Sequence, residues 1–241
     1  MTEATHGHQG WSPKQMARLA GAAYLLIIVL GVWTEGFVRG SIFVTGEPAT
    51  TAANLIAQEG LYRMGIVAET VMALADVTVA VLLYLLLRVV SRPLALAAMA
   101  FHLIETAMLG SNLLNGYAAL LVLTANTGTA LSAAPFDAVQ AQMLADFFLT
   151  LHRNGYSLAL IFFGVNCLLL GVLIWRAAFL PKALGALMAA SGLVYLTTSI
   201  VRFAAPEHYS TLSPAFVVCL IAELALALWL VVRGVDEAKW G

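Results

Sequence analysis

Four acidic residues lie in stretches of the chain that are otherwise almost entirely apolar: Glu69, Asp76, Glu105 and Glu223. A charged carboxylate at the centre of a bilayer costs at least ~2.5–3.5 kcal/mol, so such residues usually face the protein interior and serve its function. The sequence places no Lys or Arg at the same depth to neutralise them. The chemistry that cancels this charge is therefore the central question that the sequence raises.

Three kinds of chemistry could satisfy the carboxylates. A divalent metal could bind Asp76, Glu105 and Glu223 together with His102, because carboxylate and imidazole ligands from facing helices form such sites. The spacing is His-x-x-Glu, the reverse of the di-iron Glu-x-x-His pattern, and it occurs once. Alternatively, protons could neutralise some of the carboxylates, leaving one as a general acid and another as a base. Thirdly, an incoming cation or proton could meet the charge, as in a transporter.

A polar stripe accompanies the carboxylates on the third apolar stretch. His102, Glu105, Asn112 and Asn115 follow at spacings of three, seven and three residues, so they share one helix face. Only His102 falls in the half of the helix that we expect on the cytoplasmic side, so the polar stripe should be accessible from the outside. Six residues are expected to line this approach and to contact a ligand: Asn112, Asn115, His152, Arg202, Asn166 and Arg63.

A structural role is the alternative for these residues. Asn166 could join helices by a hydrogen bond, as amides do within membranes. Glu35 precedes Arg39 by four residues, which is typical of a local ion pair on one helix face. A lone buried histidine such as His102 is often merely hydrogen-bonded. The carboxylates could likewise be paired within a dry core.

The composition is that of a membrane protein. Of its 241 residues, 61% are hydrophobic and 10% are charged, and the mean hydropathy is +0.90, whereas soluble domains carry about 25% charged residues. The net charge of −1 argues against nucleic-acid binding, which needs a basic face. Cys167 and Cys219 both fall in apolar runs and are interpreted as small buried hydrophobic residues.

Six apolar stretches reach the ~20 residues that a spanning helix needs: Arg18–Val38, Tyr62–Leu87, Leu94–Thr124, Gly155–Trp175, Leu184–Arg202 and Pro214–Val232. They define one transmembrane domain over residues 16–235, between a disordered tail at 1–15 and a short tail at 236–241. Two further helices are expected on the outer surface, near 48–60 and 135–153. The second is amphipathic and should lie over the bundle or in the lipid interface, as a packed lid or as part of the site.

The distribution of basic residues predicts the orientation. The two tails and the second and fourth loops together hold eight Lys and Arg, and the other side holds four, namely Arg39, Arg63, Arg153 and Arg202. Because cytoplasmic loops carry the excess of positive charge, both termini should lie in the cytoplasm. We expect a multi-pass protein of the cytoplasmic (inner) membrane.

Several segments, in order along nearly the whole chain, carry a resemblance to a known family: Asn54-Leu55-Ile56-Ala57, Tyr62-Arg63-Met64-Gly65-Ile66, Leu151-His152-Arg153-Asn154-Gly155-Tyr156, Phe179-Leu180-Pro181-Lys182 and Glu223-Leu224-Ala225-Leu226. In these segments the chain resembles the bacterial membrane family catalogued as domain of unknown function 4386. The resemblance implies an integral membrane protein with about six spans. It brings no activity, cofactor or catalytic residue, but it suggests that Arg63, His152 and Glu223 lie in recurring motifs.

The sequence thus predicts an all-α polytopic bundle of six transmembrane helices with two extracytoplasmic surface helices. The favoured function is a small membrane enzyme or a binding protein for an apolar or amphipathic small molecule. Asp76, Glu105 and Glu223, with Glu69 above them, would form its acid–base or metal centre. A proton- or cation-coupled transporter is the alternative, and a structural or accessory subunit is the third hypothesis. Membrane lipids and the small molecule are the expected partners.

Overall fold

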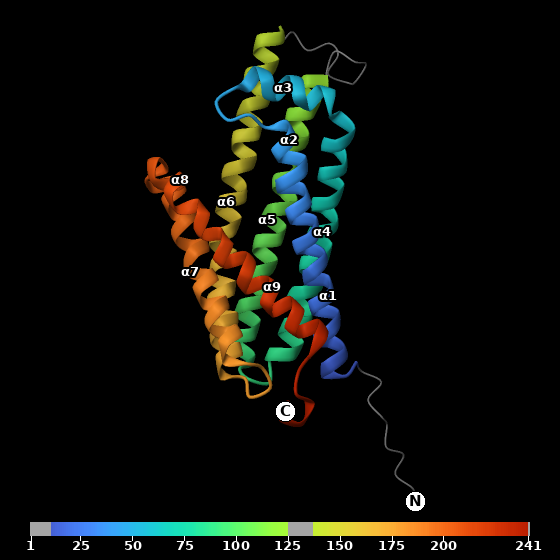
Figure 1. The fold of residues 1–241 in the computed structure, drawn as a ribbon, viewed down its shortest axis with the longest axis vertical. Helices are drawn as coiled ribbons and strands as arrows, with labels where there is room; N and C mark the ends of the chain where they lie inside the picture. The colour runs from blue at the N-terminus through green and yellow to red at the C-terminus, as the bar shows by residue number, and fades with distance from the viewer. Residues whose placement is uncertain (1–10, 125–136, 241) are drawn as a thin grey trace, which may run out of the picture.

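The chain forms a bundle of long helices, as the sequence predicts (Figure 1). The computed structural model describes residues 11–124 and 137–240, and within these two ranges it contains helices and connecting turns but no strand. The predicted N-terminal tail lies mostly outside the described residues. The prediction of an all-α fold is confirmed.

Six helical segments in the described part of the chain are long and apolar enough to cross a membrane: Pro13–Ile42, Glu59–Leu87, Arg92–Thr124, Ala138–Arg176, Lys182–Ala204 and Pro206–Val232. Each contains most of one predicted span, so the six-span prediction is confirmed and the chain is a multi-pass membrane protein. Helix α1 begins and α9 ends at the same end of the bundle, here called the base; α3 lies at the opposite, far end (Figure 1).

The first span changes its helical geometry part of the way along. Helix α1 (Pro13–Val32) begins at Ser12, whose hydroxyl accepts from the backbone N–H of Gln15 in a capping box. Near the far end it widens into a seven-residue π-helix, η1 (Trp33–Arg39), and finishes as the short α2 (Gly40–Ile42). Because π-turns are rare and concentrate at functional sites, η1 marks this end of the span for closer inspection.

Two of the next three helices, α4 (Glu59–Leu87) and α5 (Arg92–Thr124), run along the length of the bundle. They follow α3 (Pro48–Ala57), which lies across the far end as the surface helix predicted near 48–60. The buried Leu55 anchors α3 in a hydrophobic cluster with Val38, Ile42, Tyr62 and Leu120.

The predicted separate helix near 135–153 is instead the first part of one continuous helix, α6 (Ala138–Arg176), 39 residues long. The prediction of a second surface helix was wrong because nothing near Gly155 ends the helix. Asp137 caps its beginning by accepting from the N–H of Gln140, and Ala145 and Leu149 pack in one cluster with Ala119 of α5. The amphipathic pattern comes from a helix that packs on the bundle along one face only. Pro135 and Phe136 lie outside the described residues.

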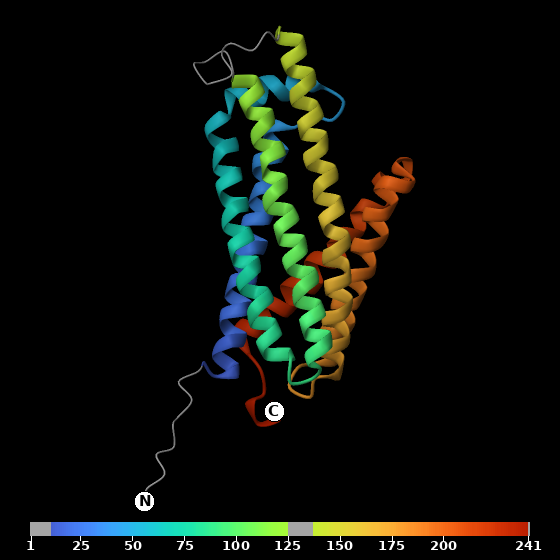
Figure 2. The same cartoon turned by 180° about the vertical axis from the view of Figure 1, so that it is seen from behind.

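The last two spans form a hairpin: α7 (Lys182–Ala204), the short η3 (Pro206–His208), α8 (Tyr209–Leu212) and η4 (Ser213–Ala215), then α9 (Phe216–Val232). Glycines hold α7 against α6 near the base. A Cβ on Gly171 would lie 2.8 Å from the carbonyl oxygen of Gly185, and one on Gly192 would lie 2.7 Å from that of Gly164. Beyond this contact α7 diverges from α6 toward α8, and α9 crosses back obliquely to the base of α1 (Figures 1 and 2).

A final short turn, η5 (Glu237–Lys239), follows α9, and the indole N–H of Trp240 donates to the carbonyl oxygen of Leu86 at 3.0 Å. The largest hydrophobic cluster includes Leu86, Leu173, Ile174 and Leu230, which are at most 1% exposed. These residues come from the parts of their helices nearest the base, so the helices are fixed most firmly there.

Candidate functional site

Arg39 is the centre of the most densely connected polar group in the described structure, which we call the Arg39 cluster: Glu35, Arg39, Glu69 and His152. Its guanidinium forms an ion pair with Glu35, one turn earlier in η1, and a second pair with Glu69 of α4 at 2.5 Å. Its Nη2 also lies 2.9 Å from Nε2 of His152. A cation therefore does meet Glu69, contrary to the sequence-based expectation, because η1 turns Arg39 inward.

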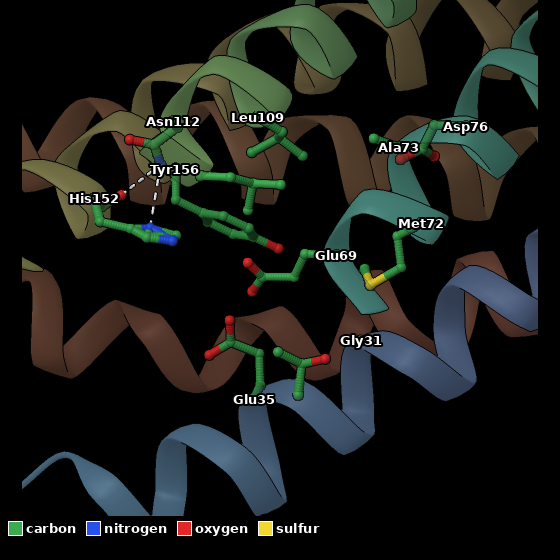
Figure 3. Close-up of a pocket in the computed structure, with 12 residues that line it drawn as sticks. Gly31, Glu35, Glu69, Met72, Ala73, Asp76, Leu109, Asn112, His152 and Tyr156 are labelled. Carbon is green, nitrogen blue, oxygen red and sulfur yellow. Dashed lines mark hydrogen bonds between the residues drawn. The ribbon is translucent and has the colours of Figure 1, made fainter. Parts of the chain in front are cut away.

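The imidazole of His152 is held from the other side by α5. The Asn112 amide nitrogen donates to the backbone carbonyl of His152 at 2.8 Å (Figure 3), and that of Asn115 donates to the Asn112 oxygen at 2.9 Å. Since a guanidinium can only donate, Nε2 of His152 is the acceptor toward Arg39. Three residues predicted to line the approach, Asn112, Asn115 and His152, thus lie together.

Gly155 makes this contact between α5 and α6 possible. A Cβ at that position would lie 2.3 Å from the side-chain oxygen of Asn112. The Leu151–Tyr156 motif therefore joins His152, which faces the Arg39 cluster, to a glycine that lets Asn112 approach the helix backbone.

A small cavity of about 40 Å³ adjoins the Arg39 cluster, and Glu35, Glu69, Asp76, His152 and Tyr156 are among its lining residues. In Figure 3 the carboxylates of Glu35 and Glu69 point toward one another, with the Tyr156 ring beside them. Asp76 lies two helical turns further along α4. The cavity extends the polar region from the Arg39 cluster toward the middle of the bundle.

The three deeper carboxylates have separate partners. Asp76 lies 3.4 Å from Nε2 of His102, Glu105 accepts from the Thr106 hydroxyl at 3.3 Å, and Glu223 accepts from the Tyr195 hydroxyl at 2.5 Å. Asp76 and Glu223 are within electrostatic reach of Glu105.

The described residues contain no group of three or more His, Cys, Asp or Glu placed to hold a metal ion. In this structure Asp76, His102, Glu105 and Glu223 are therefore not grouped as the sequence-based metal hypothesis requires. The reason is geometric: three helices bring carboxylates to a similar depth, but each carboxylate contacts its own neighbour.

Two of the predicted ligand-contacting residues lie apart from the Arg39 cluster. Asn166 faces His102 across a narrow space of about 10 Å³, and its amide nitrogen has no hydrogen-bond partner among the described residues. Arg63 is exposed and pairs with Glu59, one turn away, at 2.7 Å.

A pocket of about 440 Å³, which we call the main pocket because charged and aromatic side chains line it, lies where α7 diverges from α6. Its lining combines three arginines, four aromatic rings, two small or aliphatic residues and one carboxylate: Arg39, Arg153, Arg202, Tyr156, Tyr195, Tyr209, Phe216, Ser157, Leu160 and Glu35. Glu35 and Tyr156 also line the 40 Å³ cavity, so the two spaces are neighbours.

Of the six predicted ligand-contacting residues, Arg202 lines the main pocket. Arg153, Tyr195 and Tyr209 were missed as site residues. Arg153 and Arg202 could be recognised in the sequence, because they are two of only four basic residues on the side expected to be extracytoplasmic. No spacing rule reveals the tyrosines, because they come from different helices.

Comparison with known proteins gives a family but no activity. Residues 19–234 match the family described as "Domain of unknown function (DUF4386)". An uncharacterized protein from Archaeoglobus fulgidus is 30% identical over 159 residues, which cover 66% of this chain and 76% of that protein. No solved structure matches significantly.

Proposed function

The chain belongs to the DUF4386 family, and from this premise we propose that it is a membrane protein that binds an amphipathic small molecule in its main pocket. The observation that carries the proposal is the pocket itself. Its volume of about 440 Å³ falls within the ~300–1,000 Å³ that small-molecule sites occupy. Aromatic rings and Leu160 offer contacts to an apolar chain, and arginines offer contacts to a polar end.

Binding is better supported than catalysis. Asp76, Glu105 and Glu223, the proposed acid–base residues, are not among the residues that line the main pocket. Glu223 is linked to it through the hydroxyl of Tyr195, and Asp76 lines the neighbouring 40 Å³ cavity. An enzyme would therefore need the reacting group of its substrate to reach past Tyr195, or would use the Arg39 cluster instead.

The proposed location is the cytoplasmic membrane, with both termini in the cytoplasm and the main pocket in the outward half. The support for this orientation is the eight-to-four distribution of basic residues. Three of the four basic residues on the sparse side line the main pocket, which gives them a role other than orienting the chain.

A diazirine-bearing hexadecanol tests the proposal, with the purified protein in phosphatidylcholine nanodiscs. Irradiation should attach the probe to Leu160, Tyr195 or Phe216, and excess unlabelled hexadecanol should suppress this labelling. Leu158, exposed and two residues from Leu160, serves as the lipid-facing reference, where labelling should not saturate. Leu160→Trp should reduce pocket labelling, whereas Leu158→Trp should not. Labelling that is confined to lipid-facing residues, or that never saturates, would contradict a binding pocket.

A proton- or cation-coupled transporter is the second candidate, and a specific observation favours it. Polar groups continue from the main pocket through Glu35 and Glu69 to Asp76, which contacts His102. His102 in turn shares a narrow space with the unpartnered amide of Asn166. In proteoliposomes, hexadecanoate-driven acidification that is lost in Asp76→Asn would favour transport over binding alone.

A further inference from the structure

We infer that the molecule bound in the main pocket carries a single negative charge at its polar end, held between Arg153 and Arg202. This inference rests on the proposed binding function and specifies the chemical class of the ligand: a carboxylate or a phosphodiester on an apolar chain. It reverses the sequence-based expectation of an acidic site.

The two arginines line the same pocket from different helices, Arg153 from α6 and Arg202 from α7. The Nε of Arg202 donates to the side-chain oxygen of Asn154 at 3.2 Å, and Asn154 directly follows Arg153 in α6. The guanidinium of Arg202 also lies over the Tyr209 ring, 4.5 Å from its centroid. This stacking orients the planar group while leaving its remaining N–H donors free for a ligand.

Neither arginine is neutralised by the protein. Arg153 donates to the hydroxyl of Thr150 at 2.8 Å, and Arg202 donates to a neutral amide. Within the described ranges, no ion pair involves either side chain, although Arg39, Arg63 and Lys239 all have carboxylate partners. Arg153 is exposed and Arg202 is partly exposed, so an external anion can reach both guanidinium groups and is the expected partner.

The charge balance indicates how many negative charges the pocket needs. Arg39, Arg153 and Arg202 supply three positive charges, and Glu35 together with Glu69 behind Arg39 supplies two negative ones. The net charge is 3 − 2 = +1, because Arg153 and Arg202 carry two positive charges and the group of Arg39 with its two carboxylates carries one negative charge. A monoanionic head group would therefore neutralise the site, and a dianion or a cation would not.

The pocket also separates the two ends of such a ligand. Arg153 lies nearer the far end of α6 than Leu160, and Arg202 lies nearer the far end of α7 than Tyr195. The ring of Tyr195 packs against that of Phe216, with 5.7 Å between the centroids. The polar end would lie at the far end and the chain would point into the membrane, which is the arrangement of a lipid or fatty acid in one leaflet. Basic pockets between transmembrane helices bind anionic lipid head groups in this way.

Competition against the diazirine hexadecanol distinguishes this inference from the proposed function. Hexadecanoate should displace the probe at a concentration at least about tenfold lower than unlabelled hexadecanol or hexadecyltrimethylammonium. Replacing part of the phosphatidylcholine by phosphatidylglycerol identifies the source of the anion. Displacement by phosphatidylglycerol indicates a phospholipid, and displacement by hexadecanoate alone indicates a free amphiphile; both outcomes support a monoanionic ligand.

Arg153→Gln and Arg202→Gln should each remove the preference for hexadecanoate while labelling by the neutral probe persists, which also verifies that the variants fold. Arg63→Gln is the matched control, since Arg63 is an arginine near the same end that lies outside the main pocket and pairs with Glu59. Equal competition by hexadecanoate and hexadecanol, or an unchanged preference in both pocket variants, would overturn the inference and leave the binding proposal standing. Loss of saturable labelling by every probe would refute both.

Discussion

Arg39 pairs with two carboxylates that differ mainly in exposure, and this difference allows a test at a single ion-pair centre. The Glu69 side chain is 15% exposed and that of Glu35 is 53% exposed. Losing a buried ion-pair partner costs ~3–5 kcal/mol when it leaves a charge uncompensated, whereas exposed pairs contribute ~0–1 kcal/mol. Glu35 still balances Arg39 when Glu69 is removed, so the cost at Glu69 should fall between these two ranges.

Glu69→Gln should therefore destabilise the protein by about 1–3 kcal/mol, and Glu35→Gln by less than about 1 kcal/mol. Unfolding in mixed detergent micelles, followed by circular dichroism, measures both. The two variants remove the same charge from the same guanidinium, so each controls for the other. Equal losses would show that burial of Glu69 does not determine the strength of its pair with Arg39.

The sequence predicts which polar residues lie within the membrane spans, but not which of their side chains contact one another. Asn112 and Asn115 could be grouped because they share a helix face, and His152 could be placed near the far end. The pairing of Glu69 with Arg39 could not be predicted, because a regular α-helix was assumed where η1 forms. Arg153 and Arg202 meet only through tertiary packing, so their joint role was invisible.

At the scale of helices, the glycine contacts between α6 and α7 determine where the main pocket begins. A Cβ on Gly171 would lie 2.8 Å from backbone atoms of Gly185 and Ala189, and backbone cannot move aside as a side chain can. Gly171→Ala should separate the helices and cost ~1–3 kcal/mol, as overpacking does.

Gly110→Ala on α5 is the control for this substitution, because a Cβ there meets no atom within 4 Å. Alanine is the better helix former by up to ~1 kcal/mol, so this variant should be as stable as the parent or slightly more so. The same unfolding assay compares the two. If Gly171→Ala were as stable as Gly110→Ala, the close approach of α6 and α7 would not be needed for the fold.

The boundaries of helices were predictable only where the sequence contains a stop signal. Leu180-Pro181 and Arg92-Pro93 separate neighbouring helices in the structure as the sequence indicates. Between Arg153 and Gly155 no such signal exists, and the amphipathic pattern before it led to the incorrect expectation of a separate helix. A change in hydrophobic pattern shows a change of environment, which need not be the end of a helix.

For the whole molecule, accessibility labelling tests the orientation. Ser210 is exposed in α8, which lies in the half of the bundle away from the base, and Lys239 follows α9 at the base. In intact cells, Ser210→Cys should react with an impermeant maleimide, and Lys239→Cys should react only after permeabilisation. The native Cys167 and Cys219 are buried and should give little background. Labelling of Lys239→Cys alone would place the main pocket in the cytoplasmic half.

The six spans were the most predictable feature of the molecule, because bilayer thickness fixes the length of an apolar helix. The tilt of the α7–α9 hairpin was not predictable, since it follows from glycine contacts near the base and from the crossing of α9 over α1. A Cβ on Gly21 would lie 2.7 Å from the carbonyl oxygen of Ala227, which shows how closely that crossing is packed. The main pocket is a product of this tilt.

The divergence of α7 from α6 also has a consequence for how occupancy must be measured. A pocket located among membrane-spanning helices draws its ligand from the bilayer, and each buried CH₂ group favours the bilayer by ~0.8 kcal/mol. A sixteen-carbon amphiphile is then almost entirely dissolved in lipid. Occupancy would follow its mole fraction among the lipids rather than its molarity in the buffer. Adding empty vesicles would remove the amphiphile from the pocket, whereas diluting the suspension with buffer would leave the pocket occupied.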